Sequence, residues 1–546
     1  MPDTVRRGVN WIIVILMVAF CLASDTLFAQ GQQAEEIDTL VICPDAFRSE
    51  LKRWVDYRKG QGFKVQVEKP GRSALEVRKQ ILEVAKRHEL THIVLIGDSG
   101  DRQTDAAVKV PTDYVMARDK FTRRHSPEIA TDNRYADFDD DGIPDVSIGR
   151  IPVDSAAELK DFVDRVINYE QKGLPVESLR RISFVAGVGG FGKLIDGVIE
   201  ETTKQIITDL MPGQIETTMT YGSWTSPYCP DPRKFSQCTI DRFNEGCLFW
   251  VYIGHGGAQA LDWVYMPDQF HEILDCKSAC NLCSNQGSPI AIFLACFTNA
   301  ADGEEDCLAE IMLKQKCGPV ASIGGTRVTK PAAMGLLALG MMHDYFHNDT
   351  KTIGEIFLNA KRSMVRGDES FKEYRDMIEG LAKSFSPGGS FKIEKMEHAQ
   401  LLHLLGDPLL SIPRPQKITF GTTPKPQAGE TITISGKSPS EGTMVLELAY
   451  RRDRLKERFP RRRRYDSSEA SFTDYQQTYD QARNLVCCQV EVEVKRGMFS
   501  AEMTIPSDVD GDCVVRAMLE SNDGPGLGST AIEIQKRPSE SKRASR

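Results

Sequence analysis

The sequence lacks an excess of positive charge: its 68 lysine and arginine residues are outnumbered by 77 aspartate and glutamate residues, which gives a net charge of −9. Proteins that bind nucleic acid usually present a strongly basic surface, so a DNA or RNA partner is disfavoured. Apolar residues make up 41% and charged residues 27% of the chain, as in an ordinary soluble protein. The 546 residues are too many for one hydrophobic core and predict roughly two to four domains.

Long hydrophobic runs are also scarce, and the one that approaches a membrane-spanning length lies at the N-terminus. Trp11–Leu22 follows Arg6 and Arg7 and is itself followed by small residues that suit cleavage. This pattern predicts a signal peptide over residues 1–29, because a spanning helix needs about 20 apolar residues. An uncleaved anchor is the alternative. We therefore expect a secreted, periplasmic or cell-surface protein with no stable membrane span after signal removal.

Cysteine is present in moderate number, with 14 residues, and disulfides are permitted in an exported protein. Cys276, Cys280 and Cys283 lie close together in the sequence and leave two alternatives, disulfides or a zinc site. Their C-x3-C-x2-C spacing differs from that of a standard zinc knuckle, so disulfides are favoured. One further bridge is expected within a group near the C-terminus that consists of Cys487, Cys488 and Cys513.

The first part of the chain alternates short apolar runs with amphipathic stretches. Residues 40–43, 63–67 and 91–96 are mostly apolar and predict strands, whereas residues 46–60 and 74–88 carry apolar side chains at helical spacing. Strands that alternate with helices in this way favour a parallel sheet covered by helices on both faces. The sequence therefore predicts an α/β fold with a doubly wound, mostly parallel sheet.

Several units are expected after the signal peptide. Residues 35–172 are predicted to form an N-terminal α/β subdomain, and residues 173–413 repeat its strand–helix scheme in a catalytic α/β subdomain. Alternating apolar and polar residues over 414–535 predict a β-sandwich. Dense charge at 451–483 predicts a mobile insertion in that sandwich, and residues 536–546 are expected to be a disordered tail.

Two loops stand out because each begins where an apolar strand ends. Phe249–Ile253 runs into Gly-His255-Gly-Gly, and Ile290–Ala295 runs into Cys296. Ligand sites of open α/β sheets lie at the carboxyl ends of the strands. If the two strands are neighbours, His255 and Cys296 lie side by side. Taken singly, the cysteine would be read as a buried thiol and the histidine as a turn residue.

A neighbouring pair of this kind suits nucleophilic catalysis. A cysteine thiol is mostly protonated at neutral pH, and an adjacent imidazole can remove its proton. Glycine after the histidine leaves room for a substrate and lets a backbone N–H approach a developing oxyanion. The candidate N–H donors for that oxyanion are Gly256 and Cys296.

Four motifs occur in the order Tyr135–Pro152, Tyr252–Gly257, Leu294–Cys296 and Leu404–Pro408. Together they resemble the motifs of gingipain-type cysteine peptidases, family C25 of the caspase-like clan, over residues 38–413. The resemblance implies a caspase-like fold in two subdomains followed by an immunoglobulin-like module. It also implies a cysteine-type endopeptidase that cleaves protein or peptide substrates through a thioester acyl-enzyme and needs no cofactor for catalysis.

Asp145 has two alternative roles. In the family that the chain resembles, an acidic residue before the Ile-Gly-Arg strand orients the catalytic histidine, and Asp145 occupies that position. The residues themselves also predict a structural Ca²⁺ loop, because carboxylates at alternate positions before a glycine suit this ion. Its ligands would be Asp137, Asp139, Asp141 and Asp145, and a solvated acidic turn is the alternative.

Glu158 is the candidate residue for substrate recognition. In gingipains with a basic preference, an acid early in the helix after Gly-Arg lies in the primary pocket, and Glu158 is the nearest match. The resemblance then implies cleavage after arginine or lysine. The alternative is an ordinary acidic residue in the first turn of a helix, where the helix dipole favours it.

The sequence therefore predicts a secreted cysteine endopeptidase with His255, Cys296 and Asp145 as catalytic residues. A hypothesis from a different class is a catalytically inactive protein of the same fold that binds a surface or a partner and is stabilised by calcium. The intact pair of His255 and Cys296 favours the enzyme.

Overall fold

The structure is a computed structural model that describes residues 36–99, 107–190, 193–385, 390–460 and 462–537. The predicted signal peptide and all but the first two residues of the predicted tail lie outside these ranges. Within them, none of the helices is both long enough and apolar enough to cross a bilayer.

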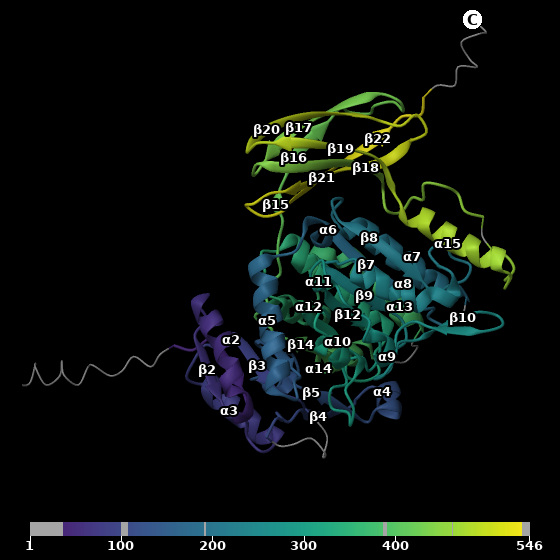
Figure 1. The fold of residues 1–546 in the computed structure, drawn as a ribbon. Coiled ribbons are helices and arrows are strands. Elements are labelled where there is room, and N and C mark those ends of the chain that lie inside the picture. The colour runs from purple at the N-terminus through teal and green to yellow at the C-terminus, as the bar shows by residue number, and fades with distance from the viewer. Residues whose placement is uncertain (1–35, 100–106, 191–192, 386–389, 461, 538–546) are drawn as a thin grey trace, which may run out of the picture.

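A ten-stranded sheet forms the centre of the larger part of the molecule (Figure 1). Its strands, in spatial order, are β2 (Val65–Glu68), β1 (Thr39–Ile42), β3 (His92–Ile96), β6 (Ser147–Ile151), β14 (Leu402–Gly406), β13 (Ala321–Gly325), β12 (Ile290–Leu294), β9 (Phe249–Ile253), β7 (Arg181–Ala186) and β8 (Glu216–Tyr221). The two predicted α/β subdomains thus share one continuous sheet.

Strand direction changes once across this sheet. β14 pairs in antiparallel fashion with β13, and Gly406 lies opposite Ala321 and Leu402 opposite Gly325. The other neighbouring pairs are parallel. The sheet therefore consists of two parallel halves of five strands that run in opposite directions, so the carboxyl ends of one half lie at the same edge as the amino ends of the other.

Helices cover both faces of the sheet, as the alternation along β1 illustrates. Leu40 and Ile42 pack in one cluster with α3 (Ala74–Ala85), whereas Val41 packs in another with α2 (Arg48–Gly60) and α5 (Ala156–Lys172). Successive side chains of a strand point to opposite faces, so a strand that is apolar throughout must be covered twice. The predicted doubly wound α/β architecture is confirmed.

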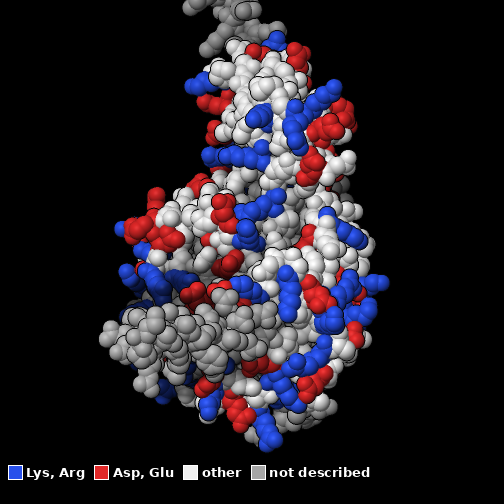
Figure 2. Space-filling view, turned by 90° about the vertical axis from the view of Figure 1, so that its left-hand side faces the viewer, with Lys and Arg blue, Asp and Glu red and all other residues white. Residues whose placement is uncertain are grey.

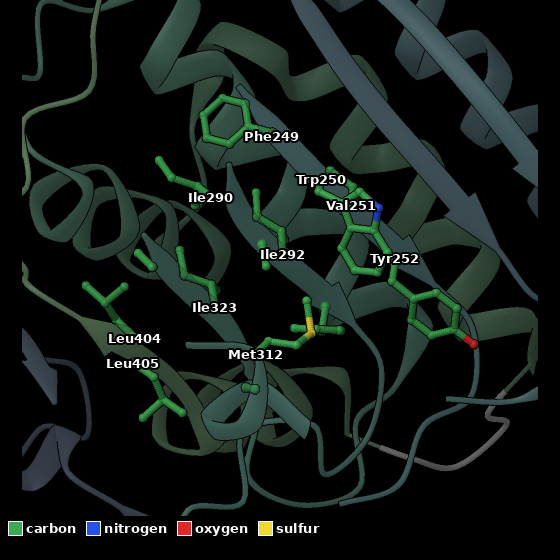
Figure 3. Close-up of a cluster of buried hydrophobic side chains, with 14 of the residues drawn as sticks. Phe249, Trp250, Val251, Tyr252, Ile290, Ile292, Met312, Ile323, Leu404 and Leu405 are labelled. Carbon is green, nitrogen blue, oxygen red and sulfur yellow. The ribbon is translucent and has the colours of Figure 1, made fainter. Parts of the chain in front are cut away.

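The second half of the sheet is packed by a larger set of helices. They are α7 (Lys193–Leu210), α8 (Phe235–Asn244), α10 (Leu308–Lys314), α11 (Pro331–His347), α12 (Ile353–Arg366), α13 (Lys372–Phe385) and α14 (Phe391–Leu401). Side chains of β9, β12, β13 and β14 meet them in a continuous apolar core (Figure 3). Trp250 stacks edge-on against Phe293 with ring centroids 5.7 Å apart. Burying a large apolar side chain contributes roughly 1.5–3 kcal/mol, so these strand ends are firmly held.

The Gly-Asp-Pro motif has a structural role at the end of β14. Asp407 is fully buried and accepts hydrogen bonds from the Trp54 indole and, at 2.6 Å, from the Arg58 guanidinium. Arg58 also pairs with Glu170 of α5 at 2.9 Å. A buried charge is tolerated only when it is paired and hydrogen-bonded. This network fixes the end of β14 against α2 and α5.

A β-sandwich follows the α/β unit. One sheet contains β15 (Gln416–Lys417), β22 (Gly526–Ile534), β21 (Gly511–Glu520), β18 (Gly442–Tyr450) and β19 (Val486–Val494), and the other contains β16 (Thr419–Thr422), β17 (Thr431–Ser438) and β20 (Gly497–Thr504). Both sheets contribute to one apolar cluster. An immunoglobulin-like topology stays a prediction. The bridge expected among Cys487, Cys488 and Cys513 does not form, since all three are free thiols.

The charged segment 451–483, which we expected to be a mobile insertion, makes specific contacts with the α/β unit. It contains α15 (Glu469–Arg483), which lies against the α/β unit beside β8 rather than on the sandwich (Figure 1). Tyr479 shares a 2.8 Å hydrogen bond with Thr220, and the Tyr475 hydroxyl donates to the Trp224 carbonyl at 3.1 Å. The Arg462 guanidinium stacks on Tyr475, 3.9 Å from the ring centroid. Buried aromatic side chains therefore anchor a segment whose charge had suggested a mobile excursion.

Charged side chains of both signs are interspersed on the face of the molecule shown in Figure 2. No broad field of one sign covers the described residues of this face. Such a surface favours solubility over attraction of a polyanion.

Replacing Tyr475 with alanine should release the charged segment from the α/β unit. Loss of a buried aromatic side chain costs about 3 kcal/mol or more, and the Arg462 guanidinium loses its stacking partner. We expect faster cleavage by trypsin within 451–483 and a lower melting temperature. Gln477→Ala, on the exposed side of the same helix, is the matched control. Equal cleavage rates for the two variants would contradict the anchoring role of Tyr475.

Candidate active site

The two candidate catalytic residues lie at the same edge of the sheet. β9 and β12 are direct neighbours in parallel register, with Ile253 opposite Leu294 at their carboxyl ends. His255 and Cys296 each follow two residues later. The register therefore places the imidazole and the thiol at corresponding positions on neighbouring loops, as the apolar strand patterns predicted.

The loop after β7 positions His255. The imidazole Nε2 lies 2.7 Å from the carbonyl oxygen of Gly189. A carbonyl only accepts hydrogen bonds, so Nε2 carries the hydrogen in this contact and Nδ1 is the nitrogen that can act as a base. The buried Tyr252 hydroxyl donates to the His255 carbonyl at 2.7 Å. The loop after β7 thus contacts the side chain of His255, and β9 itself holds its backbone.

Thr329 positions the sulfur of Cys296. Its backbone N–H donates to Sγ at 3.2 Å, and its hydroxyl lies 3.5 Å from the same sulfur. Thr329 follows β13, the strand next to β12. An N–H that points at the sulfur favours one position of the side chain and is well placed to stabilise negative charge on it.

Gly256 packs directly against Cys296. A Cβ at Gly256 would come within 2.8 Å of the Cys296 carbonyl oxygen and 3.1 Å of Ala295. Only glycine allows so close an approach of the two loops. The backbone N–H groups of Gly256 and Cys296 donate to no acceptor within the described chain, so both are available to a bound group.

His255 and Cys296 open on a cleft of about 1790 Å³. Its lining near the pair includes Gly187, Gly189, Thr329, Lys330 and Glu394. The Lys330 ammonium lies 2.8 Å from Asp119 and 3.5 Å from Glu394. Burial raises the pKa of Glu394, although Lys330 opposes this effect. The ion pairs of Lys330 thus form a compact group of charges next to Thr329, the residue that contacts the Cys296 sulfur.

Asp145 does not lie beside His255, which corrects the positioning role that we expected for it. It precedes β6, and β14, β13 and β12 lie between β6 and β9. Four strand spacings of about 4.8 Å amount to roughly 19 Å. The Asp145 carboxylate instead accepts a hydrogen bond from the Phe138 N–H at 2.7 Å. One contact of the His255 side chain is with the carbonyl oxygen of Gly189.

The acidic residues of the predicted calcium loop come together only in part. One carboxylate oxygen each of Asp137, Asp139 and Asp145 lies within 4.8 Å of the others. Asp141 is outside this group and pairs with Arg366 at 3.3 Å. Burial and the neighbouring acidic residues raise the pKa of Asp137 to about 6, against the lowering effect of the Gly142 N–H.

Glu158 also lies away from the cleft, which corrects the expected substrate pocket. It belongs to α5, which follows the carboxyl end of β6, and this end lies at the opposite edge of the sheet because β6 runs antiparallel to β12. Its carboxylate accepts from the Asp154 N–H at 2.9 Å, and its own N–H donates to Ser155 at 3.3 Å. These reciprocal bonds cap the helix, so the alternative interpretation of Glu158 is the one that the geometry supports.

Of the three clustered cysteines for which disulfides were favoured, only one forms a disulfide. Cys283 forms a disulfide with Cys317, while Cys276 and Cys280 carry free thiols. A zinc site would need the thiolate of Cys283, so the favoured disulfide interpretation holds for this residue.

Two positioning contacts were missed from the sequence, those of Gly189 and Thr329. Gly189 had a recognisable signal, because a glycine-rich stretch follows the apolar strand 181–186, just as glycines flank His255. Thr329 had none, since its role depends on the curvature of the loop after β13.

Fold and site together define the class of the molecule: an α/β protein of caspase-like architecture with a cysteine beside a histidine at one edge of its sheet. The chain belongs to peptidase family C25, whose sequence profile matches residues 32–413.

Curated relatives and solved structures agree with this assignment. Gingipain R2 of Porphyromonas gingivalis is 23% identical over 359 residues, which cover 62% of this chain and 44% of the relative. Gingipain R1 of the same species is 24% identical over 345 residues, which cover 60% of this chain and 31% of the relative. The chain therefore spans less than half the length of these relatives. The crystal structure of the Arg-specific cysteine proteinase gingipain R superposes with a TM-score of 0.51 at 16% identity and covers 92% of this chain and 99% of its own.

A buried histidine supports the loop that contacts Cys296. Lys330, the residue after Thr329, donates its backbone N–H to His398 Nε2 at 2.9 Å, and His398 Nδ1 lies 2.7 Å from the Glu394 carbonyl. His398 Nε2 can accept the hydrogen bond from the Lys330 N–H only when this nitrogen carries no proton. Burial lowers the pKa of His398 to about 4, and burial lowers the pKa of His403 to about 4 as well.

These two histidines should make the protein less stable in acid. In the unfolded chain a histidine binds a proton near pH 6.5, whereas these folded sites do so only near pH 4, so stability falls as pH drops through that window. At pH 4.5 each of the two histidines should lower the free energy of unfolding by about 2–3 kcal/mol relative to pH 7. His398→Gln, whose amide oxygen can replace Nε2, should reduce the loss of unfolding free energy between pH 7 and pH 4.5 by roughly 2–3 kcal/mol in urea unfolding. The exposed His125→Gln is the control, and an unchanged pH dependence in His398→Gln would refute the assignment.

Proposed function

We propose that this protein is a secreted cysteine endopeptidase that uses His255 and Cys296 as a catalytic dyad. The observation that carries the proposal is the register of β9 and β12, which brings the two residues to one sheet edge at the mouth of a cleft. Membership of family C25 supports the same chemistry. The signal-peptide pattern of residues 1–29 and the Cys283–Cys317 disulfide support export, since disulfides persist in oxidising compartments.

In the proposed reaction, His255 accepts the thiol proton and the Cys296 sulfur attacks the carbonyl carbon of the scissile peptide bond. The oxygen becomes negatively charged and receives hydrogen bonds from the N–H groups of Gly256 and Cys296. The C–N bond then breaks, His255 returns the proton to the leaving amine, and a thioester remains on Cys296. Water, deprotonated by His255, hydrolyses the thioester to a carboxylate and restores the thiol.

The substrate is proposed at the level of proteins and peptides. The name of the structurally similar gingipain R states a preference for arginine, but Glu158 lies at the wrong edge of the sheet to provide it here. The charged residues that line this cleft include Lys330, which follows Thr329 in the chain, and its ion-pair partner Glu394. A panel of peptides that differ only in the residue before the scissile bond will identify the preference.

An electrophilic peptide ketone should modify Cys296 selectively. His255→Ala should lower the rate of modification and kcat/KM for a peptide substrate by roughly 10²–10⁴-fold, the usual contribution of a general base. Mass spectrometry of tryptic peptides locates the adduct. Cys280, an exposed free thiol without a neighbouring histidine contact, is the internal control for non-specific alkylation.

The competing hypothesis makes the opposite forecast. An inactive binding protein of this fold would show no faster modification at Cys296 than at Cys280. It would also show no effect of His255→Ala on either thiol. That result would refute the endopeptidase proposal.

Neighbouring glycines provide a second test of the geometry. A methyl group at Gly256 would press on the Cys296 carbonyl and on Ala295, whereas one at Gly257 would meet nothing closer than the Ala260 carbonyl at 3.6 Å. We expect Gly256→Ala to lower kcat by about 10²-fold or more, the scale of losing one oxyanion donor, and Gly257→Ala to retain most activity. Equal kcat values for the two variants would show that Gly256 does not shape the oxyanion site.

A further inference from the structure

The loop before β6 gathers carboxylates that serve no part of the proposed reaction. Asp137, Asp139 and Asp145 each contribute an oxygen to a group in which all three lie within 4.8 Å of one another. None of the three forms an ion pair with a lysine, arginine or histidine in the described chain. Nearby arginines instead pair with Asp140 and Asp141. The three carboxylates are thus held together without an ion pair to a cation of the described chain, although Arg78 and Arg362 contact backbone carbonyls of the same loop.

One carboxylate oxygen of Asp137 is buried without a hydrogen-bond donor in the described chain. Its side chain is only 3% exposed, and Oδ2 accepts from the Gly142 N–H at 3.0 Å. Its other oxygen, Oδ1, is buried and meets no hydrogen-bond donor among the described residues. A buried carboxylate oxygen without a donor is costly, because it loses water and gains nothing in return. A bound cation would satisfy it.

The backbone of the loop wraps around these oxygens. Asp140 has a φ of +61° and Gly142 a φ of +87°, which turn the chain sharply. The Asp139 carboxylate accepts from the Asp141 N–H at 3.1 Å, and the Asp141 carboxylate accepts from the Ile143 N–H at 2.7 Å. The carboxylates are therefore held in place by the loop itself.

We propose that Asp137, Asp139 and Asp145 form a Ca²⁺ site, completed by backbone carbonyls and water. Ca²⁺ accepts six to eight oxygen ligands in flexible geometry, whereas Mg²⁺ demands a regular octahedron and keeps more of its water. The ligands come from positions one, three and nine of a loop with glycine at position six, which is the spacing of known calcium loops. No acidic residue stands at position twelve, where Ile148 occurs, so the affinity should be modest, with Kd roughly 10⁻⁴–10⁻³ M.

The site is connected to the active-site edge through α14. The Gln400 amide of this helix donates to the Gly142 carbonyl, and the same helix carries His398, which accepts from Lys330 beside Thr329. Arg362 of α12 donates to the Asp145 carbonyl at 2.6 Å. Calcium in the loop therefore stabilises α14 and, through it, the loop that contacts Cys296. The connection between the calcium site and the active site rests on the proposed function, whereas calcium binding by the loop does not.

Binding should be measured on the full chain carrying Cys296→Ala, which prevents self-digestion. After removal of metal with EGTA, titration with CaCl₂ in a calorimeter should give one saturable site, and the melting temperature should rise by roughly 3–6 °C at saturation. MgCl₂ at equal concentration should produce a smaller rise. Asp139→Asn, at an exposed position, should weaken calcium binding at least tenfold.

Asp140→Asn is the matched control, because its carboxylate contacts Arg78 outside the group and its calcium affinity should equal that of the parent. Absence of saturable binding in the parent protein, or equal affinity in Asp139→Asn and the parent, would overturn the site. In the active protein, calcium should protect against thermal loss of activity, and Asp139→Asn should abolish that protection while leaving Cys296 modification intact in calcium-free buffer. Calcium binding without such protection would overturn only the connection to the active site.

Discussion

The antiparallel pairing of β13 with β14 determines where every functional element of this protein lies. It joins two parallel half-sheets that run in opposite directions. As a result, the carboxyl ends of β9 and β12 share an edge with the amino end of β6. His255, Cys296 and the acidic loop are therefore on one side of the molecule, and the start of α5 is on the other. The buried contacts of Asp407 with Arg58 and Trp54 fix the end of β14, so this pairing cannot shift without loss of a fully desolvated ion pair.

That pairing also explains which parts of the site could be predicted from the sequence. His255 and Cys296 follow strong local signals, since each ends a buried apolar run, and neighbouring strands in a parallel half-sheet bring such ends together. Asp145 and Glu158 were placed by resemblance to motifs of a known family, and that resemblance did not include the strand direction that decides the edge of the sheet on which each residue lies. The strand at which the direction changes is short, and Leu402–Gly406 looks like the end of the preceding helix in the sequence. Strand direction across a sheet is a tertiary property, so local patterns could not reveal it.

The charged segment was misjudged for a different physical reason. Dense charge suggested a mobile excursion, yet Phe472, Tyr475 and Tyr479 recur at helical spacing and form one buried face. Arginine guanidinium groups stack on aromatic rings while their charge stays in contact with water or acidic neighbours. Arg462 on Tyr475 and Arg233 on Phe472 both do so. High charge therefore gave little information about burial here, whereas the aromatic periodicity was the reliable signal.

The correction of Asp145 changes the chemical requirements of the proposed dyad. In a serine enzyme, a carboxylate orients the histidine and stabilises the imidazolium that forms. Here the carbonyl of Gly189 is one of the groups that contact the ring, and a neutral carbonyl stabilises an imidazolium less than a carboxylate would. A thiol needs less help, because it is far more acidic than a hydroxyl and its thiolate is itself the counter-ion of the imidazolium. Backbone groups of Gly189, Thr329 and Gly256 can then suffice, provided that their loops are held rigidly by the strands and by α14 beneath them.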